Sequence, residues 1–99
     1  MNVKQFKGKN QFIITSEKEI VFQSYDSVIA KIDKTKGTND LTLGKNWKYS
    51  KTTLKHLYIF LNDYYYMTVY SKIENSKNKR AEIQKMIDNG FIKYDEEIR

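Results

Sequence analysis

The sequence predicts an α+β fold in which an antiparallel β-meander of three to five strands carries two helices packed on one face. In the first half of the chain, short runs rich in β-branched and aromatic residues follow one another through brief polar links. In the second half, apolar residues recur at helical spacing. With 99 residues the chain is expected to form a single domain, residues 1–99, in which 1–8 are loose and 95–99 are a frayed tail.

Four strands are expected before the first helix. A polar turn at 16–18 would join the first two as a hairpin, and Tyr25-Asp26 would form either a tight turn or a bulge before the third. A loop from Asp33 to Asp40 precedes the short fourth strand, which Gly44 closes. The expected strands are residues 11–15, 19–24, 27–32 and 41–43.

The first helix is expected to follow Ser50, whose hydroxyl can accept a free backbone N–H of the first turn. The periodic apolar residues extend it to about Asn62. Beyond that point the sequence leaves two alternatives open, because Tyr64–Tyr70 fits either a continued helix or a strand-like aromatic segment. The apolar positions of the helix are Leu54, Leu57, Tyr58 and Leu61.

A second helix is expected at 77–88, with Ser76 as its cap and Asn89-Gly90 as a left-handed stop. Residues 91–94 could then form a closing strand.

Composition excludes several classes of protein. The chain is 39% hydrophobic and 30% charged, which is too apolar for a disordered chain. No apolar run is long enough to cross a membrane, and no signal peptide is expected. The absence of cysteine excludes disulfides and thiolate zinc sites. We therefore expect a cytoplasmic protein, either of a bacterium or made by a phage inside its host cell.

The net charge of +6 is unevenly distributed. Through His56 there are eleven lysines and five acids, whereas the rest of the chain is neutral with seven basic and seven acidic residues. Lysines near the start of the first helix could hold a phosphate backbone or an acidic partner, since the amides of a helix N-terminus add positive potential. A solvated lysine-rich helix face opposite Leu54 and Leu57 is the favoured explanation. The lysines concerned form a row along the sequence, Lys45, Lys48, Lys51 and Lys55.

Aromatic residues supply the other candidate contacts. Trp47 and Tyr49 precede the helix and could stack on bases, although the core is the favoured place for Trp47. The tyrosines between 64 and 70 are too dense for every ring to be buried, so part of this cluster is expected on a partner surface. A homodimer through the cluster stays open. The candidate contact tyrosines are Tyr64, Tyr66 and Tyr70.

Catalysis is not expected. His56 is the only histidine, and no acid lies one helical turn from it, so it is a poor metal ligand or general base. The carboxylates show no paired pattern, and the four glycines form no phosphate-binding loop. Hence no catalytic residue, metal or cofactor is predicted.

Two stretches resemble a family of small uncharacterised proteins encoded by phages and mobile elements of low-GC Gram-positive bacteria. They are Phe22–Ala30, of the pattern F-x-S-Y-x-(S/T)-x-(I/V)-A, and Trp47–Leu61, which begins W-x-Y-S-x-T-T. The resemblance covers about residues 10–62 and 77–94, and 63–76 departs from it. It implies a setting and no activity. Its signature positions are Ser24, Tyr25, Trp47, Tyr49, Ser50 and Thr53.

We therefore expect a non-enzymatic phage accessory protein. It would inhibit a host-defence or nucleic-acid-handling complex, such as CRISPR-Cas, by binding a protein or nucleoprotein surface. The alternative is direct binding of DNA or RNA through a surface of lysines and tyrosines.

Overall fold

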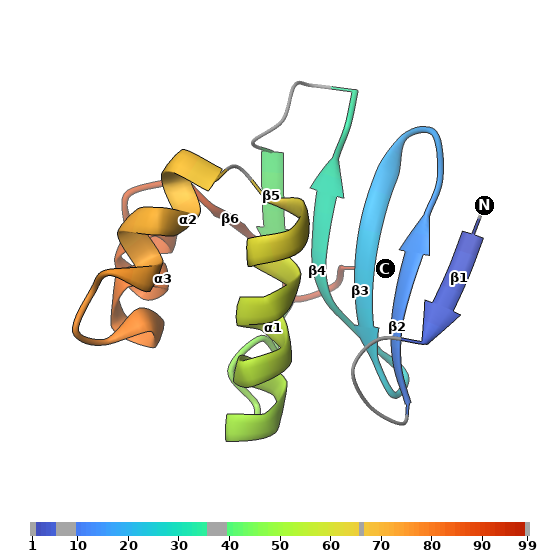
Figure 1. Ribbon diagram of the computed structural model, residues 1–99, viewed down its shortest axis with the longest axis horizontal. Helices are drawn as coiled ribbons and strands as arrows, with labels where there is room; N and C mark the ends of the chain where they lie inside the picture. The colour runs from blue at the N-terminus through green and yellow to red at the C-terminus, as the bar shows by residue number, and fades with distance from the viewer. Residues whose placement is uncertain (1, 6–9, 36–39, 66, 99) are drawn as a thin grey trace.

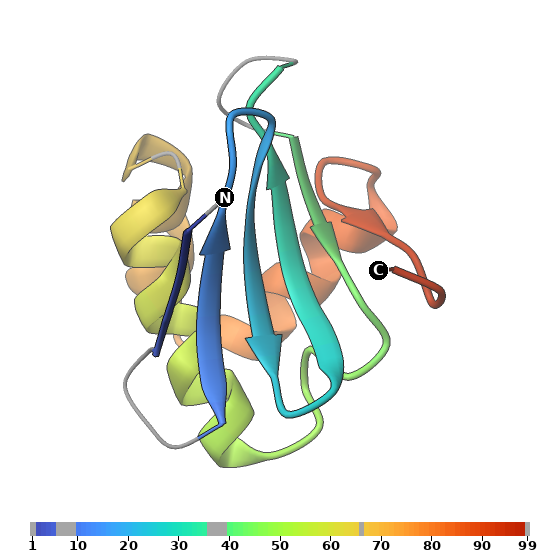
Figure 2. The same ribbon diagram turned by 90° about the vertical axis from the view of Figure 1, so that its right-hand side faces the viewer.

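The sheet and the helices form two layers. The computed structural model describes residues 2–5, 10–35, 40–65 and 67–98. Within these ranges, six strands form one sheet in chain order, and three helices lie on one of its faces (Figures 1 and 2). The α+β class is thus confirmed. The strands are β1 Asn2–Gln5, β2 Gln11–Thr15, β3 Glu19–Ser24, β4 Ser27–Asp33, β5 Asp40–Leu43 and β6 Lys93–Tyr94, and the helices are α1 Lys51–Tyr64, α2 Met67–Glu74 and α3 Lys79–Asp88.

Strands β1 to β5 are an antiparallel meander, and β6 joins the edge of β5 in parallel. The predicted count of three to five strands was wrong by one, because β1 lies in the segment expected to be loose. Its residues pair from Asn2↔Thr15 to Gln5↔Phe12. A four-residue edge strand with Val3 as its one apolar residue carries no alternation that a sequence pattern could detect. Residues 1 and 6–8 lie outside the described ranges.

The chain reverses between β3 and β4 in a tight turn at Tyr25-Asp26. Tyr25 has a φ of 54°, in the left-handed region. The register between the strands also shifts beside Phe22 and Gln23, which places Ile29 as an extra residue in β4. The turn and the bulge together end the hairpin next to the start of α1.

Helix α1 begins as predicted, because the Ser50 hydroxyl accepts the amide of Thr53 at 3.1 Å. It ends at Tyr64, since Tyr65 has extended backbone angles (φ −91°, ψ 171°). The chain then forms α2, which makes three helices instead of the predicted two. Aromatic and β-branched residues in this stretch fit strands as well as helices, so propensity alone could not decide between them.

The predicted cap of α3 was also wrong. Asn78 caps the helix, since its side-chain oxygen accepts the amide of Ala81 at 3.1 Å. The Ser76 hydroxyl instead donates to the carbonyl of Ile73 at 2.6 Å and so completes the end of α2. Gly90, with a φ of 82°, provides the predicted left-handed stop.

Residues 95–98 return to the sheet. The amide of Asp95 donates to the carbonyl of Leu43 at 3.0 Å, and the amide of Ile98 donates to Asp95 at 3.3 Å. This segment, expected to be frayed, forms a turn against Gly44 in its described part. In the described ranges no helix has both the length and the apolar character needed to cross a membrane.

The core lies between the sheet and the helices. A row of directly paired residues crosses the helix-facing side of the sheet: Ile13, Phe22, Ala30 and Leu43. Helix α1 packs Leu57, Phe60 and Leu61 against this layer, and the rings of Phe60 and Phe22 stack at 5.7 Å. Trp47 is 1% exposed, which confirms the preference for a core position.

Candidate functional site

The helix-facing side of the sheet becomes polar at one end. Side chains on a strand alternate, so Gln11 faces the same way as Ile13, and Ser24 the same way as Phe22. Gln11 pairs with Ser24, which pairs with Ser27. These polar residues therefore continue the core row into the region beside the N-terminus of α1.

The facing helix is polar at the same end. Along the sheet-facing side of α1, Thr53 comes one turn before the buried Leu57. The buried polar side chains among the described residues are Gln11, Ser24 and Thr53, each at most 6% exposed. All three line one pocket. The sheet and α1 are thus separated by a pocket at the end where both present mainly polar side chains.

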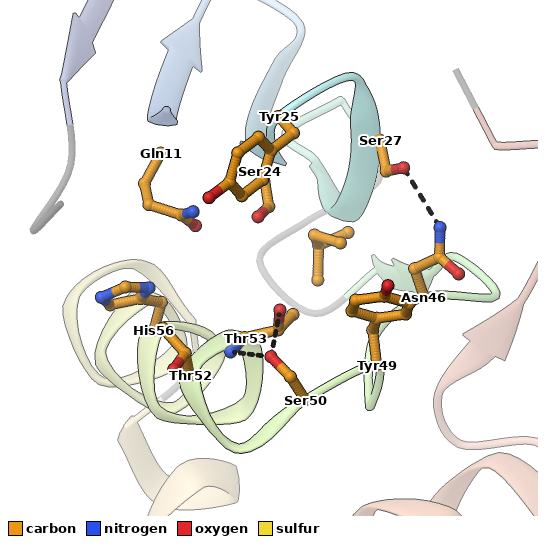
Figure 3. A pocket seen from close by; sticks show the side chains of 11 residues that line it. Gln11, Ser24, Tyr25, Ser27, Asn46, Tyr49, Ser50, Thr52, Thr53 and His56 are labelled. Carbon is orange, nitrogen blue, oxygen red and sulfur yellow. Dashed lines mark hydrogen bonds between the residues drawn. The ribbon is translucent and has the colours of Figure 1, made fainter. Parts of the chain in front are cut away.

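The pocket has a volume of about 790 Å³. Figure 3 shows its two walls: residues from the end of the sheet on one side and residues of the first turns of α1 on the other. Hydroxyls, amides, two tyrosine rings and one imidazole line it, and no carboxylate is among the described lining residues. The lining residues are Gln11, Ser24, Tyr25, Ser27, Ile29, Asn46, Tyr49, Ser50, Thr52, Thr53 and His56.

The strand side of the pocket is held by the turn at Tyr25. The amide of Tyr25 donates to the carbonyl of Asn10 at 2.7 Å, and its carbonyl accepts from the Gln23 side chain at 2.9 Å. The Tyr25 side chain is nevertheless 65% exposed. The Asn46 amide donates to the Ser27 hydroxyl at 3.1 Å and closes one end (Figure 3).

On the helix side, Tyr49 is the residue before the N-cap and is 79% exposed. The Ser50 hydroxyl bonds both the amide and the hydroxyl of Thr53, each at 3.1 Å. It therefore serves the helix as a cap and is poorly placed as a nucleophile. Tyr25 and Tyr49 stand on the two walls of the pocket, one on the strand side and one on the helix side (Figure 3).

His56 lies one turn after Thr52 and faces the pocket (Figure 3). Burial, and to a smaller extent the Lys55 ammonium, lower the pKa of His56 below its usual 6.5, so the imidazole is neutral at about pH 7. Within the described residues, no group of three or more His, Asp and Glu side chains is placed to hold a metal ion.

Gln11 places a buried amide oxygen at the site. Its side chain is 4% exposed, and in the described part of the chain its Oε1 accepts no hydrogen bond. Figure 3 shows the amide end of Gln11 directed into the space between the sheet and α1. A buried amide oxygen without a donor costs free energy, so a molecule that offers a donor here would be favoured.

The structure divides the predicted lysine row. Lys51 and Lys55 are exposed and share one side of α1 next to the pocket wall. Lys48 instead lies over the Trp47 ring, with its Nζ 5.4 Å from the ring centroid, and donates to Gln84 of α3 at 3.1 Å. Lys45 is exposed beside a second pocket that Asp26 and Glu96 also line.

The predicted tyrosine contacts are also divided. Tyr64 is half-buried, and its ring lies 5.4 Å from that of Phe60. Tyr70 is 5% exposed and belongs to the core cluster. Tyr66 lies outside the described residues. The exposed tyrosines at the pocket are instead Tyr25, which the sequence did not indicate as a contact residue, and Tyr49, which it indicated as a ring that could stack on bases.

A sequence signal for the pocket did exist. Gln11 and Ser24 occupy inward positions of β2 and β3, in phase with Ile13 and Phe22. Polar residues at inward positions mark either a buried hydrogen bond or a site. Gln11 lies in the first predicted strand and His56 lies far along the chain, in the first predicted helix. The sequence pattern therefore could not show that the two residues line one pocket.

Comparisons with known proteins add a family and no activity. No curated protein and no solved structure matches the chain. Residues 1–85, which include every lining residue of the pocket, match the model of a family of unknown function (DUF8033), and the chain belongs to that family.

Proposed function

We propose that the protein is a non-enzymatic phage or mobile-element protein that inhibits a host-defence or nucleic-acid-handling complex, such as CRISPR-Cas, by binding a protein or nucleoprotein surface. It would act in the cytoplasm of the host cell. The phage setting rests on the sequence resemblance alone. The contact surface would be the pocket between the end of the sheet and α1.

The observation that carries the binding role is the exposure of two tyrosines at one polar pocket. Tyr25 and Tyr49 are 65% and 79% exposed although each is large enough to add much to a core. Their backbones are fixed by the turn and by the helix cap, so the rings are presented at little cost in entropy. Exposed aromatics on a rigid frame are typical anchors of macromolecular interfaces.

Two features of the pocket support a role without catalysis. The described lining residues include one imidazole, that of His56, and no carboxylate. The Ser50 hydroxyl is engaged with Thr53 in the helix cap. The pocket therefore offers hydrogen bonds and ring surfaces more readily than an activated nucleophile.

Direct binding of DNA or RNA is the second candidate. It is favoured by Lys51 and Lys55, which stand beside Tyr49 and the N-terminal amides of α1. Proteins that bind single-stranded DNA or RNA commonly combine lysines with aromatic rings on which the bases stack. Such binding would weaken steeply as salt rises, whereas capture of a protein partner would not.

A capture experiment tests the proposal. The tagged protein is used to pull down partners from host lysate with and without nuclease, in parallel with Tyr25→Asn/Tyr49→Ala and with Tyr94→Ala, an exposed tyrosine of β6. The proposal predicts a partner that the double variant loses and the β6 control keeps. A partner retained equally by all three proteins, or none at all, would contradict the proposed surface.

A further inference from the structure

Gln11 places a buried, unsatisfied amide oxygen at the pocket. It is 4% exposed, and its Oε1 has no hydrogen-bond partner among the described residues. Figure 3 shows that it is directed between the walls of the pocket, with the Ser24 hydroxyl nearby and His56 across from it. A glutamine amide presents an acceptor and a donor side by side. This is the pattern that matches the hydrogen-bonding edge of a nucleobase.

The pocket also offers surfaces for a flat ring. Tyr25 and Tyr49 are both exposed, and they belong to opposite walls. Ile29, 1% exposed, adds an apolar side chain to the lining. Unpaired bases are held in this way, by stacking on aromatic rings and by hydrogen bonds to their edges.

Positive potential lies next to these rings. Ser50 accepts the amide of Thr53, and the earlier amides of the first turn have no carbonyl within the helix to bond. Lys51 and Lys55 extend from the same turns of α1. A phosphate attached to a base in the pocket would therefore meet helix amides and lysines, and no carboxylate among the described lining residues would repel it.

We propose that this pocket binds one unpaired nucleobase of a single-stranded nucleic acid, with Gln11 bonding the base edge, Tyr25 and Tyr49 contacting its faces, and the adjoining phosphate beside the N-terminus of α1. The inference rests on the proposed function in the case where the partner surface contains nucleic acid. It identifies the nucleic-acid strand as the component that the pocket reads.

The pocket should distinguish an unpaired base from a paired base and from a backbone without bases. A paired base in a duplex has both faces stacked and its pairing edge occupied, so it cannot enter the pocket. A backbone without bases would meet the lysines but would leave Gln11 and the tyrosine rings without contacts. Affinity should therefore follow the order single strand, then abasic strand and duplex.

Fluorescence anisotropy with labelled oligomers of about eight nucleotides tests this order at constant salt. The probes are single-stranded DNA and RNA, the matching duplex, and an abasic strand of the same length. The single strand is expected to bind at least about tenfold more tightly than the abasic strand, as expected for stacking of a base. Equal affinity for all probes would overturn the inference, because it would show binding through charge alone.

Variants assign the effect to the pocket. Tyr49→Ala and Gln11→Leu should each reduce the preference for the single strand over the abasic strand by about tenfold, and Tyr94→Ala should leave it unchanged. Gln11→Leu is buried, so its fold is checked by thermal unfolding, and Tyr49→Ala, at an exposed position, repeats the test without that risk. A full preference in Tyr49→Ala would overturn the role of the ring.

The two proposals fail in different ways. If no oligomer binds while a nuclease-resistant protein partner is captured and depends on Tyr25 and Tyr49, the base inference is wrong and the proposed function stands. In that case the pocket holds a peptide segment instead. If the oligomers bind with the expected order but no partner complex is captured, the inference stands and the inhibitor role fails.

Discussion

At the scale of single residues, the start of α1 depends on one hydroxyl. Ser50 bonds the amide and the hydroxyl of Thr53, and these bonds fix both the first turn of the helix and one wall of the pocket. Ser50→Ala should lower the free energy of unfolding by about 1 kcal/mol, equivalent to roughly 4–8 °C in a domain of this size. Thermal unfolding followed by circular dichroism measures the shift.

Ser71→Ala is the matched control for the cap. The Ser71 hydroxyl bonds the Thr68 carbonyl inside α2, which the helix satisfies without it, and alanine is the better helix former. An equal loss in both variants would show that Ser50 acts through general helix propensity and not as a cap.

Tyr25 occupies a backbone conformation that suits another residue better. Its φ of 54° favours asparagine or glycine over tyrosine. Tyr25→Asn should therefore keep or slightly raise the free energy of unfolding, by up to about 1 kcal/mol, while it removes the exposed ring. Chemical denaturation tests this, and a clear loss of stability would mean that the ring supports the fold instead of a partner contact.

The hydroxyl of Tyr65 is buried and, among the described residues, has no hydrogen-bond partner. Burial, assisted by the Asp40 carboxylate, raises the pKa of Tyr65 to about 12. The unfolded chain releases this proton near 10, so the stability linked to it is full below pH 10 and is lost as the pH rises to about 12.

Tyr65→Phe should therefore be as stable as the wild type or more stable at neutral pH, because it removes an unsatisfied hydroxyl. It should also lose less stability than the wild type between pH 10 and about 12. Denaturation at several pH values gives the free energy of unfolding of both proteins. Because the two proteins have the same lysines, the titration of the lysines cancels in the difference between these free energies. If both proteins lost the same free energy of unfolding between pH 10 and about 12, the raised pKa of Tyr65 would be contradicted.

Sequence reasoning reached part of the site at this scale. Ser50 and Trp47 were placed correctly because a cap and a large aromatic leave local signals. Tyr25 was not considered as a contact residue, and Tyr49 was considered only as a ring that could stack on bases, since nothing local shows whether a ring has space to be buried. That depends on which elements pack above it, and Trp47 already fills the core position.

At the scale of elements, Gly44 joins β5, the hairpin and the C-terminal segment. A Cβ at this position would lie 2.5 Å from the carbonyl oxygen of Val28 and 2.5 Å from a methyl group of Ile98. The Ile98 side chain could move, but the backbone oxygen in β4 could not. Gly44→Ala should destabilise the protein by about 1–3 kcal/mol in chemical denaturation.

Gly90→Asn provides the comparison. Gly90 has a φ of 82° but nothing within 4 Å of an added Cβ, and asparagine tolerates the left-handed region. This variant should lose less stability than Gly44→Ala. The reverse order would mean that Gly44 does not lie against the Val28 carbonyl as described.

Strands β2 and β3 were predicted residue for residue because alternation and turn residues mark them on both sides. Strand β1 and helix α2 were missed for different reasons. Strand β1 is defined by its pairing with β2, which is a tertiary contact. Helix α2 is made of residues whose propensities fit a strand equally, and its packing against α3 decides the outcome.

At the scale of the whole molecule, part of the excess positive charge lies on α1 beside the pocket, on Lys51 and Lys55. Each lysine that contacts a phosphate of a single strand contributes about 0.7 to the slope of log affinity against log salt. Lys51→Gln/Lys55→Gln should therefore reduce that slope by about 1.4. Lys72→Gln/Lys85→Gln, at exposed positions of α2 and α3, has the same net charge and should leave the slope unchanged. Equal slopes for both pairs would indicate diffuse attraction.

The most direct test of the pocket as the contact site is a map of amide chemical shifts on the ¹⁵N-labelled protein as a single-stranded oligomer is added. If a base binds in the pocket, the largest changes should occur in Gln11 with its side-chain amide, in Tyr25, in residues 49–53 and in His56. Changes gathered instead on the helix-free face of the sheet, at Phe12 and Ile14, or around β6, would contradict the assignment of the pocket as the contact site.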